Sequence, residues 1–355
     1  MQETIEGLHE IRELAAQFAA ERLRPNVERW DHERALDEQA PAQLGELGFH
    51  GMMVPEAQGG LGFGAASFVA VLEEIAWGEP AAAFLLLSSA AVATALTGSR
   101  DASHAQWLAG LAAGARCGAI ELAREYRLEA QREGSAWRLH GEARWVLRGH
   151  GQEILLLGAT AAPDAARALF VLAANEPIRG GKRETMIGLR AARIEATAVE
   201  RVTLSESARV DSARVRDVER IERLGTAAIA IGIARAALEH ARAYANIREQ
   251  FGRRLRRFAG IQAKLADMDT RVAAAHALVG QAAIETTGTA AARAKLFASE
   301  TAMWVSTQAV QIFGGYGYMR DYPVEKTMRD AKTTEILTGS SEDLRALIAE
   351  GLYAD

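Results

Sequence analysis

Hydrophobic residues in the N-terminal part of the chain recur at helical spacing. In residues 1–24 they fall on one helical face and comprise Ile5, Leu8, Ile11, Leu14, Phe18 and Leu23. Pro25 is expected to end this helix. Further helices are predicted at 37–47 and, with two breaks at glycines, at 65–113. The pattern therefore predicts an N-terminal helical domain at residues 1–115.

The pattern changes after residue 116. Apolar positions now fall in short runs rich in β-forming residues, and Gly and Pro separate the runs. These runs are 137–140, 153–157, 168–172, 193–198 and 201–204. We expect residues 116–215 to form a small β domain between two helical domains.

Beyond residue 216 the helical pattern is long and regular. Apolar stripes comprise Ile229, Ile233, Ala237, His240, Tyr244 and Ile247, and then Ile261, Leu265, Met268, Val272, Ala275 and Val279. A third helix is expected at about 289–312 and a last one at about 341–352. Residues 216–355 are therefore predicted to form a C-terminal four-helix bundle, and the fold class is α+β, mainly α. We interpret His240 as a hydrogen-bonded core histidine.

Composition excludes several classes of function. The 355 residues suffice for two or three domains, and the net charge of −5 without a basic run argues against nucleic acid as a partner. The single cysteine, Cys117, excludes an internal disulfide framework and a Cys-rich metal site. The eight histidines are scattered along the chain and form no ligand-like pair on a helix face. We therefore expect no metal site.

No segment has the character of a membrane anchor or a signal peptide. The N-terminus, MQETIEGLHE, is acidic, and the apolar run 81–97 is shorter than the roughly 20 residues of a membrane-spanning helix. We interpret this run as a buried core helix. A cytoplasmic location is the expectation that follows.

The stretch from Gln311 to Asp330, QIFGGYGYMRDYPVEKTMRD, is the most distinctive in the chain. It follows a helical run, and its glycines allow the backbone to approach another group closely. A Rossmann fingerprint would follow a strand and open a helix, so the stretch does not fit one. The sequence at Gly180-Gly181-Lys182 is not a P-loop either, because Glu176 stands where that motif has its first glycine.

This stretch resembles the C-terminal signature of the acyl-CoA dehydrogenase family. The loop at 48–62, with Val54-Pro55-Glu56, is similar to an N-terminal loop of the same family, and the resemblance covers most of the chain. It implies a helical domain, a β domain and a helical bundle. It also implies FAD as cofactor, acyl-CoA as substrate, an electron-transfer flavoprotein or similar acceptor, and a homo-oligomer. In such enzymes a carboxylate removes the α proton of the thioester while the β hydride goes to the flavin.

The resemblance also assigns cofactor-binding positions. The element Arg248-Glu249-Gln250-Phe251-Gly252 looks like the family's Arg-x-x-Phe-Gly, which places Arg248 at the FAD pyrophosphate and Phe251 near the adenine. In the family this element comes from the neighbouring subunit, together with the residues matching Gln311, Gly314 and Gly315. Ser340 and Glu342 would touch the other end of the flavin. Ala259 departs from the pattern, since the family often has Gln there.

The position of the general base departs from the commonest pattern. Many members carry a Glu-Gly-Thr triplet, whereas this chain has Thr338-Gly339-Ser340, and a threonine hydroxyl is no useful base. Glu222 matches the base position of isovaleryl-CoA and long-chain acyl-CoA dehydrogenases. Arg223 would hold its carboxylate, and Thr338 with Gly339 would bind the substrate, Thr338 through its free backbone N–H. The alternative interpretation of Glu222 is an exposed first-turn residue that complements the helix dipole.

The β domain departs further from the family. The usual Thr-Glu-Pro and Gly-Ser-Asp segments, which touch the isoalloxazine, are replaced by a shorter loop after residues 119–123. Trp145 is kept, but the Thr of the family's Trp-Ile-Thr turn is replaced by Leu147. FAD is therefore expected to bind more weakly than is usual for the family. Two alternatives stay open: a flavin-poor, non-catalytic subunit of a heteromeric dehydrogenase, and a binding protein without turnover. The acyl chain, and the choice between CoA and a carrier-protein thioester, are also open.

Overall fold

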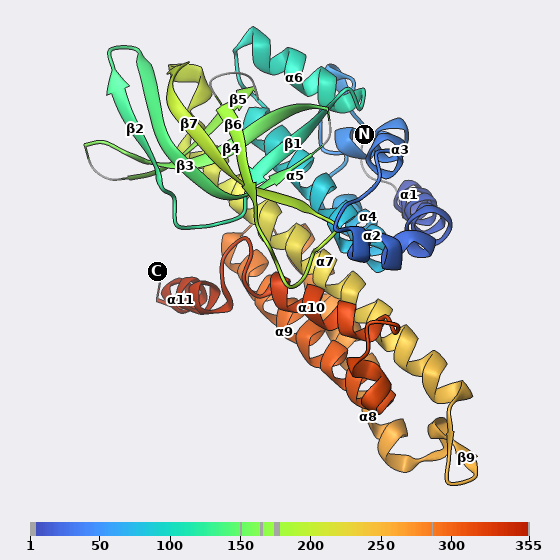
Figure 1. Cartoon of the computed structure of the whole chain (residues 1–355). Coiled ribbons are helices and arrows are strands. Elements are labelled where there is room, and N and C mark those ends of the chain that lie inside the picture. Colours follow the sequence, from blue (N-terminus) through green and yellow to red (C-terminus); the bar gives the residue numbers. More distant parts are fainter. Residues whose placement is uncertain (1–4, 150, 164–165, 174–177, 286, 354–355) are drawn as a thin grey trace.

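The computed structural model describes the chain except for residues 1–4, 150, 164–165, 174–177, 286 and 354–355. N-terminal helices and a β domain lie at one end of the molecule, and a long helical bundle extends away from them (Figure 1). The middle of the longest helix, α7, packs against both parts. The main hydrophobic core runs through all three regions.

The N-terminal region is helical, as its apolar stripes predict. Its helices are α1 (Ile5–Phe18), α2 (Val27–Glu33), α3 (Gln39–Glu46), α4 (Ala65–Gly78), α5 (Pro80–Leu96) and α6 (Ala102–Ala112). The first helix does not stop at Pro25: it widens into a π-helical turn, Ala19–Leu23, and then tightens into a 3-10 turn that holds the proline. Almost every residue of α5 is buried, which confirms the interpretation of this run as a core helix.

The central region is a mixed sheet. Its strands are β1 (Arg116–Glu121), β2 (Leu128–Glu133), β3 (Ala136–Arg148), β4 (Gln152–Ala161), β5 (Ala166–Ala173), β6 (Ile178–Arg183) and β7 (Arg193–Ser205). The order is β1-β4-β2-β3-β7-β6, β5 pairs with β4, and β1 also pairs with β3. The predicted runs 193–198 and 201–204 form one strand, β7, which continues although Arg201 within it adopts a left-handed conformation (φ 56°).

The C-terminal helices are α7 (Ser212–Ile247), α8 (Ala259–Ile284), α9 (Gly288–Phe313), α10 (Val324–Thr334) and α11 (Ser341–Gly351). A hairpin of two short strands, β8 (Glu249–Gln250) and β9 (Arg253–Arg254), joins α7 to α8 at the tip. α10, which the apolar pattern did not predict, packs along α7 and α9, whereas α11 lies to one side against α9 (Figure 1). α10 is therefore the fourth helix of the bundle.

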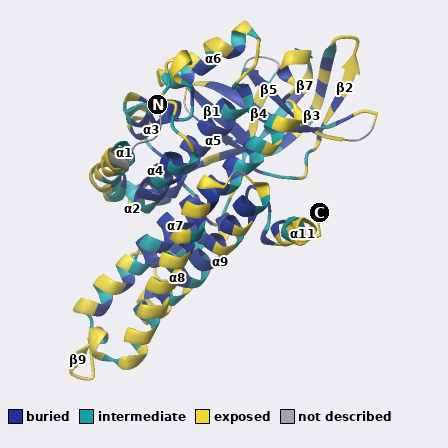
Figure 2. Cartoon of the chain, turned by 180° about the vertical axis from the view of Figure 1, so that it is seen from behind, coloured by how far each residue is buried: buried dark blue, intermediate teal, exposed yellow. Residues whose placement is uncertain are grey.

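Burial falls towards the tip of the bundle. Buried residues concentrate where the N-terminal helices, the sheet and the near half of α7 meet, and the hairpin end is mostly exposed (Figure 2). The sheet also has a core of its own, which includes Leu128, Trp137, Leu155 and Phe170. His240 is only half-buried, but its Nε2 lies 3.0 Å from Arg24 Nη2. Burial and this guanidinium lower the pKa of His240 to about 4, so its ring is neutral at pH 7.

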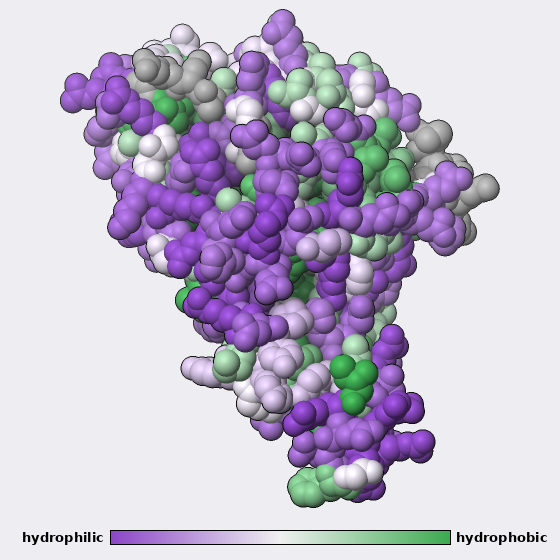
Figure 3. Space-filling view, turned by 45° about the vertical axis from the view of Figure 1, so that its right-hand side comes forward, coloured by the Kyte–Doolittle hydropathy of each residue, from purple (hydrophilic) through white to green (hydrophobic). Residues whose placement is uncertain are grey.

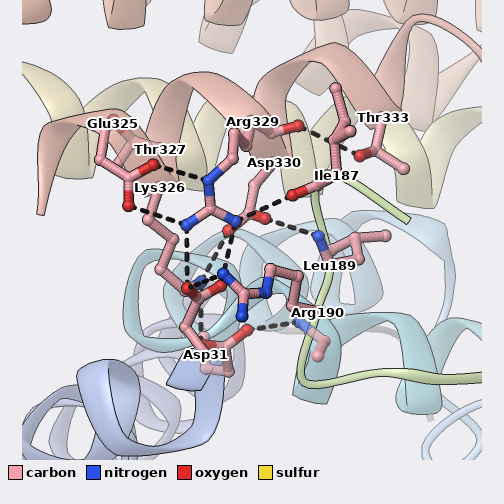
Figure 4. A network of polar contacts seen from close by, with 12 residues as sticks. Asp31, Ile187, Leu189, Arg190, Glu325, Lys326, Thr327, Arg329, Asp330 and Thr333 are labelled. Carbon is pink, nitrogen blue, oxygen red and sulfur yellow. Dashed lines mark hydrogen bonds and ion pairs between the residues drawn. The ribbon is translucent and has the colours of Figure 1, made fainter. Parts of the chain in front are cut away.

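The signature pair Arg329-Asp330 joins the domains. The Arg329 guanidinium binds Asp31 of α2 and Glu325, and Asp31 also accepts from Arg190 on the loop before β7 (Figure 4). Asp330 accepts from the backbone N–H of Leu189 at 2.6 Å. These charges fix α10 to α2 and to the loop before β7.

Candidate active site

The candidate site lies where the edge of the sheet meets α7 and the loop after α10. The hydroxyls of Thr226, on α7, and Thr338, in that loop, are 2.8 Å apart, and both residues are fully buried. Glu222 lies four residues before Thr226, so the two side chains share one face of the helix. The fold therefore brings Glu222 and the Thr338 loop together.

Glu222 is a buried carboxylate. It lies in the third turn of α7 and is 3% exposed, so it is not an exposed first-turn residue. Its Oε2 accepts from Nη2 of Arg124, on the loop between β1 and β2. Burial raises the pKa of Glu222 above its ordinary value, and the Arg124 charge opposes that rise. The site thus holds a carboxylate whose basicity is increased by burial and whose Oε2 is already hydrogen-bonded to Arg124.

Arg124, rather than Arg223, is the partner of Glu222. Arg223 donates to Glu219 at 3.0 Å, one turn back on the same helix, and its buried Nε has no hydrogen-bond partner among the described residues. Its charge still lowers the pKa of Glu222, as the last of several contributions. The prediction that Arg223 holds the carboxylate is therefore wrong. No sequence motif points to Arg124. The one feature of the sequence that could have drawn attention to it is its position in the shortened loop.

The Thr338 loop is held tightly. Thr338 adopts a left-handed conformation (φ 58°), which is unusual for a β-branched residue, and Gly339 follows with φ 105°. The Thr338 N–H donates to the carbonyl of Leu122, at the end of β1, over 3.4 Å. It is thus not free for a thioester carbonyl, contrary to the expectation. Lys295 Nζ, also buried, donates to Gly339 O at 2.5 Å, and burial lowers the pKa of Lys295 to about 7.

Trp145 and Glu121 lie on the part of the sheet that faces the candidate site. Trp145 is half-buried in a bulge of β3, with φ 53°, and its carbonyl accepts from Leu122 N–H at 3.0 Å. Sequence reasoning did not single out Glu121. Its oxygens accept the N–H groups of Arg144 and Gly158, at 3.1 and 3.0 Å, and burial raises its pKa to about 7.

The Arg248 element lies far from Glu222. Arg248 caps the C-terminus of α7, 26 residues after Glu222, which is roughly 40 Å along the helix. Its guanidinium lies over the Tyr316 ring, 5.4 Å from the centroid. Gln250 is exposed in β8, and Phe251 is 93% exposed with φ 52°. Within one chain the two predicted sets of residues do not form a single site.

Gln311, Gly314 and Gly315 lie at the same end of the bundle. They form the last turn of α9 and the 3-10 turn Gly314–Tyr318, and all three are exposed. A Cβ on Gly314 or Gly315 would meet nothing within 4 Å, so no part of the described chain requires glycine there for space. Gly314 has φ 61° and ψ −136°, a backbone conformation that only glycine adopts readily.

Ser340 and Glu342 begin α11. The Ser340 hydroxyl accepts from Asp343 N–H at 3.1 Å, while Asp343 accepts from Ser340 N–H at 3.0 Å, a reciprocal capping box. Glu342 is exposed in the first turn. Ser340 therefore has a structural role at the N-terminus of this helix, and Glu342 adds a negative charge to its first turn.

Other features of the described chain lie outside this site. Pockets of about 730 and 680 Å³ border α7 elsewhere, and neither is lined by Glu222 or Thr338. Among the described residues, no three His, Cys, Asp or Glu side chains gather as metal ligands. We also find no helix in the described ranges with the length and apolar character needed to span a bilayer.

Comparisons with known proteins agree over the whole chain. Residues 6–115 match the family model "Acyl-CoA dehydrogenase, N-terminal domain", and residues 219–353 match "Acyl-CoA dehydrogenase, C-terminal domain". An acyl-CoA dehydrogenase of Bacillus subtilis is 33% identical, over 96% of this chain and 97% of its own length. The match is therefore neither local nor confined to one domain.

Two solved structures have nearly the same fold. The butyryl-CoA dehydrogenase of Megasphaera elsdenii is 28% identical and has a TM-score of 0.92. A chain from a structure described as an electron transferring flavoprotein of Acidaminococcus fermentans is 30% identical, also with a TM-score of 0.92. In both cases the match covers 100% of each chain.

Proposed function

Because this chain belongs to the acyl-CoA dehydrogenase family, oxidoreductases that act on acyl-CoA, we propose that it dehydrogenates an acyl thioester between its α and β carbons, with Glu222 as general base. The family resemblance seen in the sequence is confirmed by these comparisons. The proposal includes a cytoplasmic location, a homo-oligomer, and an electron-transfer flavoprotein or similar protein as electron acceptor.

The burial of Glu222 beside the Thr338 loop carries this proposal. The α C–H bond of a thioester is weakly acidic, so its cleavage needs a base stronger than an exposed carboxylate. Burial raises the pKa of Glu222 in the required direction. In this step the α proton moves to the Glu222 carboxylate, and the electron pair stays on the substrate as an enolate. Arg124 occupies Oε2 of Glu222, so transfer of the proton to that oxygen requires release of Arg124.

FAD is the cofactor of this family and, when bound, would supply the acceptor for the β hydride; the chain fits it only in part. Arg248, Phe251 and Gln311 are presented at the tip of the bundle and suit the pyrophosphate and adenine end. The ring side does not fit: Leu122 and Thr338 are hydrogen-bonded to each other, and Arg124 is bound to Glu222. These groups stand where the resemblance places the isoalloxazine.

This partial fit favours a second candidate function. A chain whose ring side is closed, but whose Arg248 and Phe251 face outward, can complete the flavin site of a different subunit. In that case it is the flavin-poor, non-catalytic subunit of a heteromeric acyl-CoA dehydrogenase. The two candidates differ in whether Glu222 reacts with substrate.

The test is exchange of the α proton of an acyl-CoA with D₂O, followed by mass spectrometry. Exchange reports on the base alone and needs no electron acceptor. Glu222→Gln keeps the shape and removes the base, so we expect at least a hundredfold slower exchange than in the wild type. Glu239→Gln, the same substitution on an exposed part of α7, is the control and should change little.

Exchange at near wild-type rate in Glu222→Gln would show that the base is elsewhere, with Glu335 and Glu342 next to test. A wild type that exchanges no α proton, alone or with FAD added, would favour the non-catalytic subunit.

A further inference from the structure

Arg124 crosses from the sheet to the bundle. It lies on the loop between Glu121, which ends β1, and Leu128, which begins β2, and it reaches Glu222, 98 residues away in sequence. The Arg124 side chain is 16% exposed and that of Glu222 is 4% exposed. A buried guanidinium is costly unless it is paired, so each partner depends on the other.

The loop that carries Arg124 is itself fixed. Arg124 Nη1 donates to the Tyr126 hydroxyl at 3.1 Å, and the Tyr126 ring lies directly on the backbone of Gly158 in β4. A Cβ at Gly158 would lie 2.2 Å from two carbons of that ring. The absence of a side chain at Gly158 therefore leaves room for the Tyr126 ring, which is hydrogen-bonded to Arg124.

A second contact lies across the same space between the sheet and the C-terminal helices. Leu122 O and Thr338 N, from the sheet and from the loop after α10, are 3.4 Å apart. An aromatic ring needs about 3.5 Å to the atoms on each of its faces, so it needs about 7 Å between the groups that flank it. Neither the Leu122–Thr338 contact nor the Arg124–Glu222 pair leaves that distance.

We propose that the Arg124–Glu222 salt bridge excludes a flavin ring from this chain, which therefore binds the adenine end of FAD without the isoalloxazine in place. The inference rests on the second candidate function, the flavin-poor subunit, because a chain without the flavin ring has no acceptor for the β hydride. It takes from the family resemblance only the place of the ring beside Glu222. Arg124 acts as a positioning residue: it holds Glu222 and closes the gap.

FAD and ADP titrations of the purified full-length chain test this exclusion. Arg124→Ala should lower the Kd for FAD at least tenfold relative to the wild type, while the Kd for ADP, which lacks the ring, should stay within twofold. Because Arg124→Ala leaves Glu222 buried and unpaired, the double variant Arg124→Ala/Glu222→Gln is measured in parallel, with the same expectation. Flavin fluorescence and isothermal calorimetry provide the readouts.

Arg148 provides a matched control. Its pair with Glu153 joins β3 and β4 and is as deeply buried, with side chains 10% and 6% exposed, and the hydrogen-bond partners of Arg148 among the described residues lie within the sheet rather than on α7. Arg148→Ala should therefore leave the Kd for FAD unchanged. If both Arg124 variants fold, as judged by circular dichroism, and bind FAD no more tightly than the wild type, the inference is wrong. It is equally wrong if the wild type retains one FAD per chain through dialysis.

These outcomes are separate from those of the proposed function. If Arg124→Ala gains FAD affinity while Glu222→Gln keeps its α-proton exchange, the exclusion by Arg124 stands and the role of Glu222 as base falls. If the wild type both exchanges the α proton and holds FAD fully, the base stands and the exclusion falls.

Discussion

Buried ionisable side chains concentrate beside the Thr338 loop, and Lys295 is the most unusual of them. Its ammonium is fully buried, and the Gly339 carbonyl is its hydrogen-bond partner. Burial, followed by the nearby charges of Arg124 and Arg223, lowers the pKa of Lys295 to about 7 from 10.5. Burial also raises the pKa of Glu222. Both shifts favour the neutral forms.

Lys295 makes stability depend on pH. Between about pH 7 and pH 10.5 the unfolded chain holds a proton on this residue that the folded chain does not, so the free energy of unfolding rises with pH across this window. The gain is at most about 1.4 kcal/mol per pH unit. We expect Lys295→Met to lose much of the gain between pH 7 and pH 9, measured by urea unfolding. Lys182→Met, at an exposed position, is the control and should keep it. An unchanged pH slope in Lys295→Met would contradict the assignment.

At the scale of elements, close helix crossings depend on small residues. Gly232 of α7 faces α4, where an added Cβ would lie 2.5 Å from the carbonyl oxygen of Glu73. Gly280 of α8 is also in a helix interior, but an added Cβ there would meet nothing within 4 Å. The same residue type thus has opposite roles: Gly232 is required for packing, whereas Gly280 only lowers helix stability.

The two glycines give opposite predictions. Gly232→Ala should lower the free energy of unfolding by about 1–3 kcal/mol, because the α4 backbone must shift. Gly280→Ala should raise it by up to about 1 kcal/mol, because alanine favours the helix. Denaturant unfolding of both variants measures the difference. Equal changes in the free energy of unfolding of the two variants would show that the α4–α7 crossing adjusts to an added methyl group without loss of stability.

At the scale of the whole molecule, the tip of the bundle is an unusual surface. Ile247 is 72% exposed and Phe251 is 93% exposed, and hydrophobic patches appear there within a hydrophilic surface (Figure 3). The tip also carries Arg248, which is roughly 40 Å from Glu222 of the same chain. Such a surface suits contact with another subunit, in which the tip of one chain completes the site of another.

We therefore expect self-association to depend on the tip. Phe251→Ser should shift the mass measured by light scattering at micromolar concentration towards the monomer, since a large exposed aromatic residue is lost. Ile187→Ser, at a residue 66% exposed on the loop after β6, is the control and should not change the mass. A monomeric wild type would contradict the homo-oligomer. A wild type that associates only with a related chain would favour the heteromeric subunit.

The sequence by itself determined the order of the three regions and the location of Glu222. Helical and strand periodicities show which side of each local element is buried. The position of Glu222 on α7 follows from its fixed sequence distance to the Arg248 element. It could not determine the partner of Glu222. Arg223 was expected from adjacency, but consecutive helical residues point in different directions, and Glu219, one turn away, binds Arg223 instead.

Only the tertiary structure brought Arg124 to Glu222 and Leu122 to Thr338. Those contacts depend on how the shortened loop folds over Gly158 and on how closely the sheet approaches α7. The place of α10 in the bundle was decided in the same way, because its charged residues have partners on α2 and on the loop before β7. Local sequence patterns cannot predict such pairings between residues far apart in the sequence. A buried ion pair is stable only when both charges are present, and the second charge lies outside the local segment.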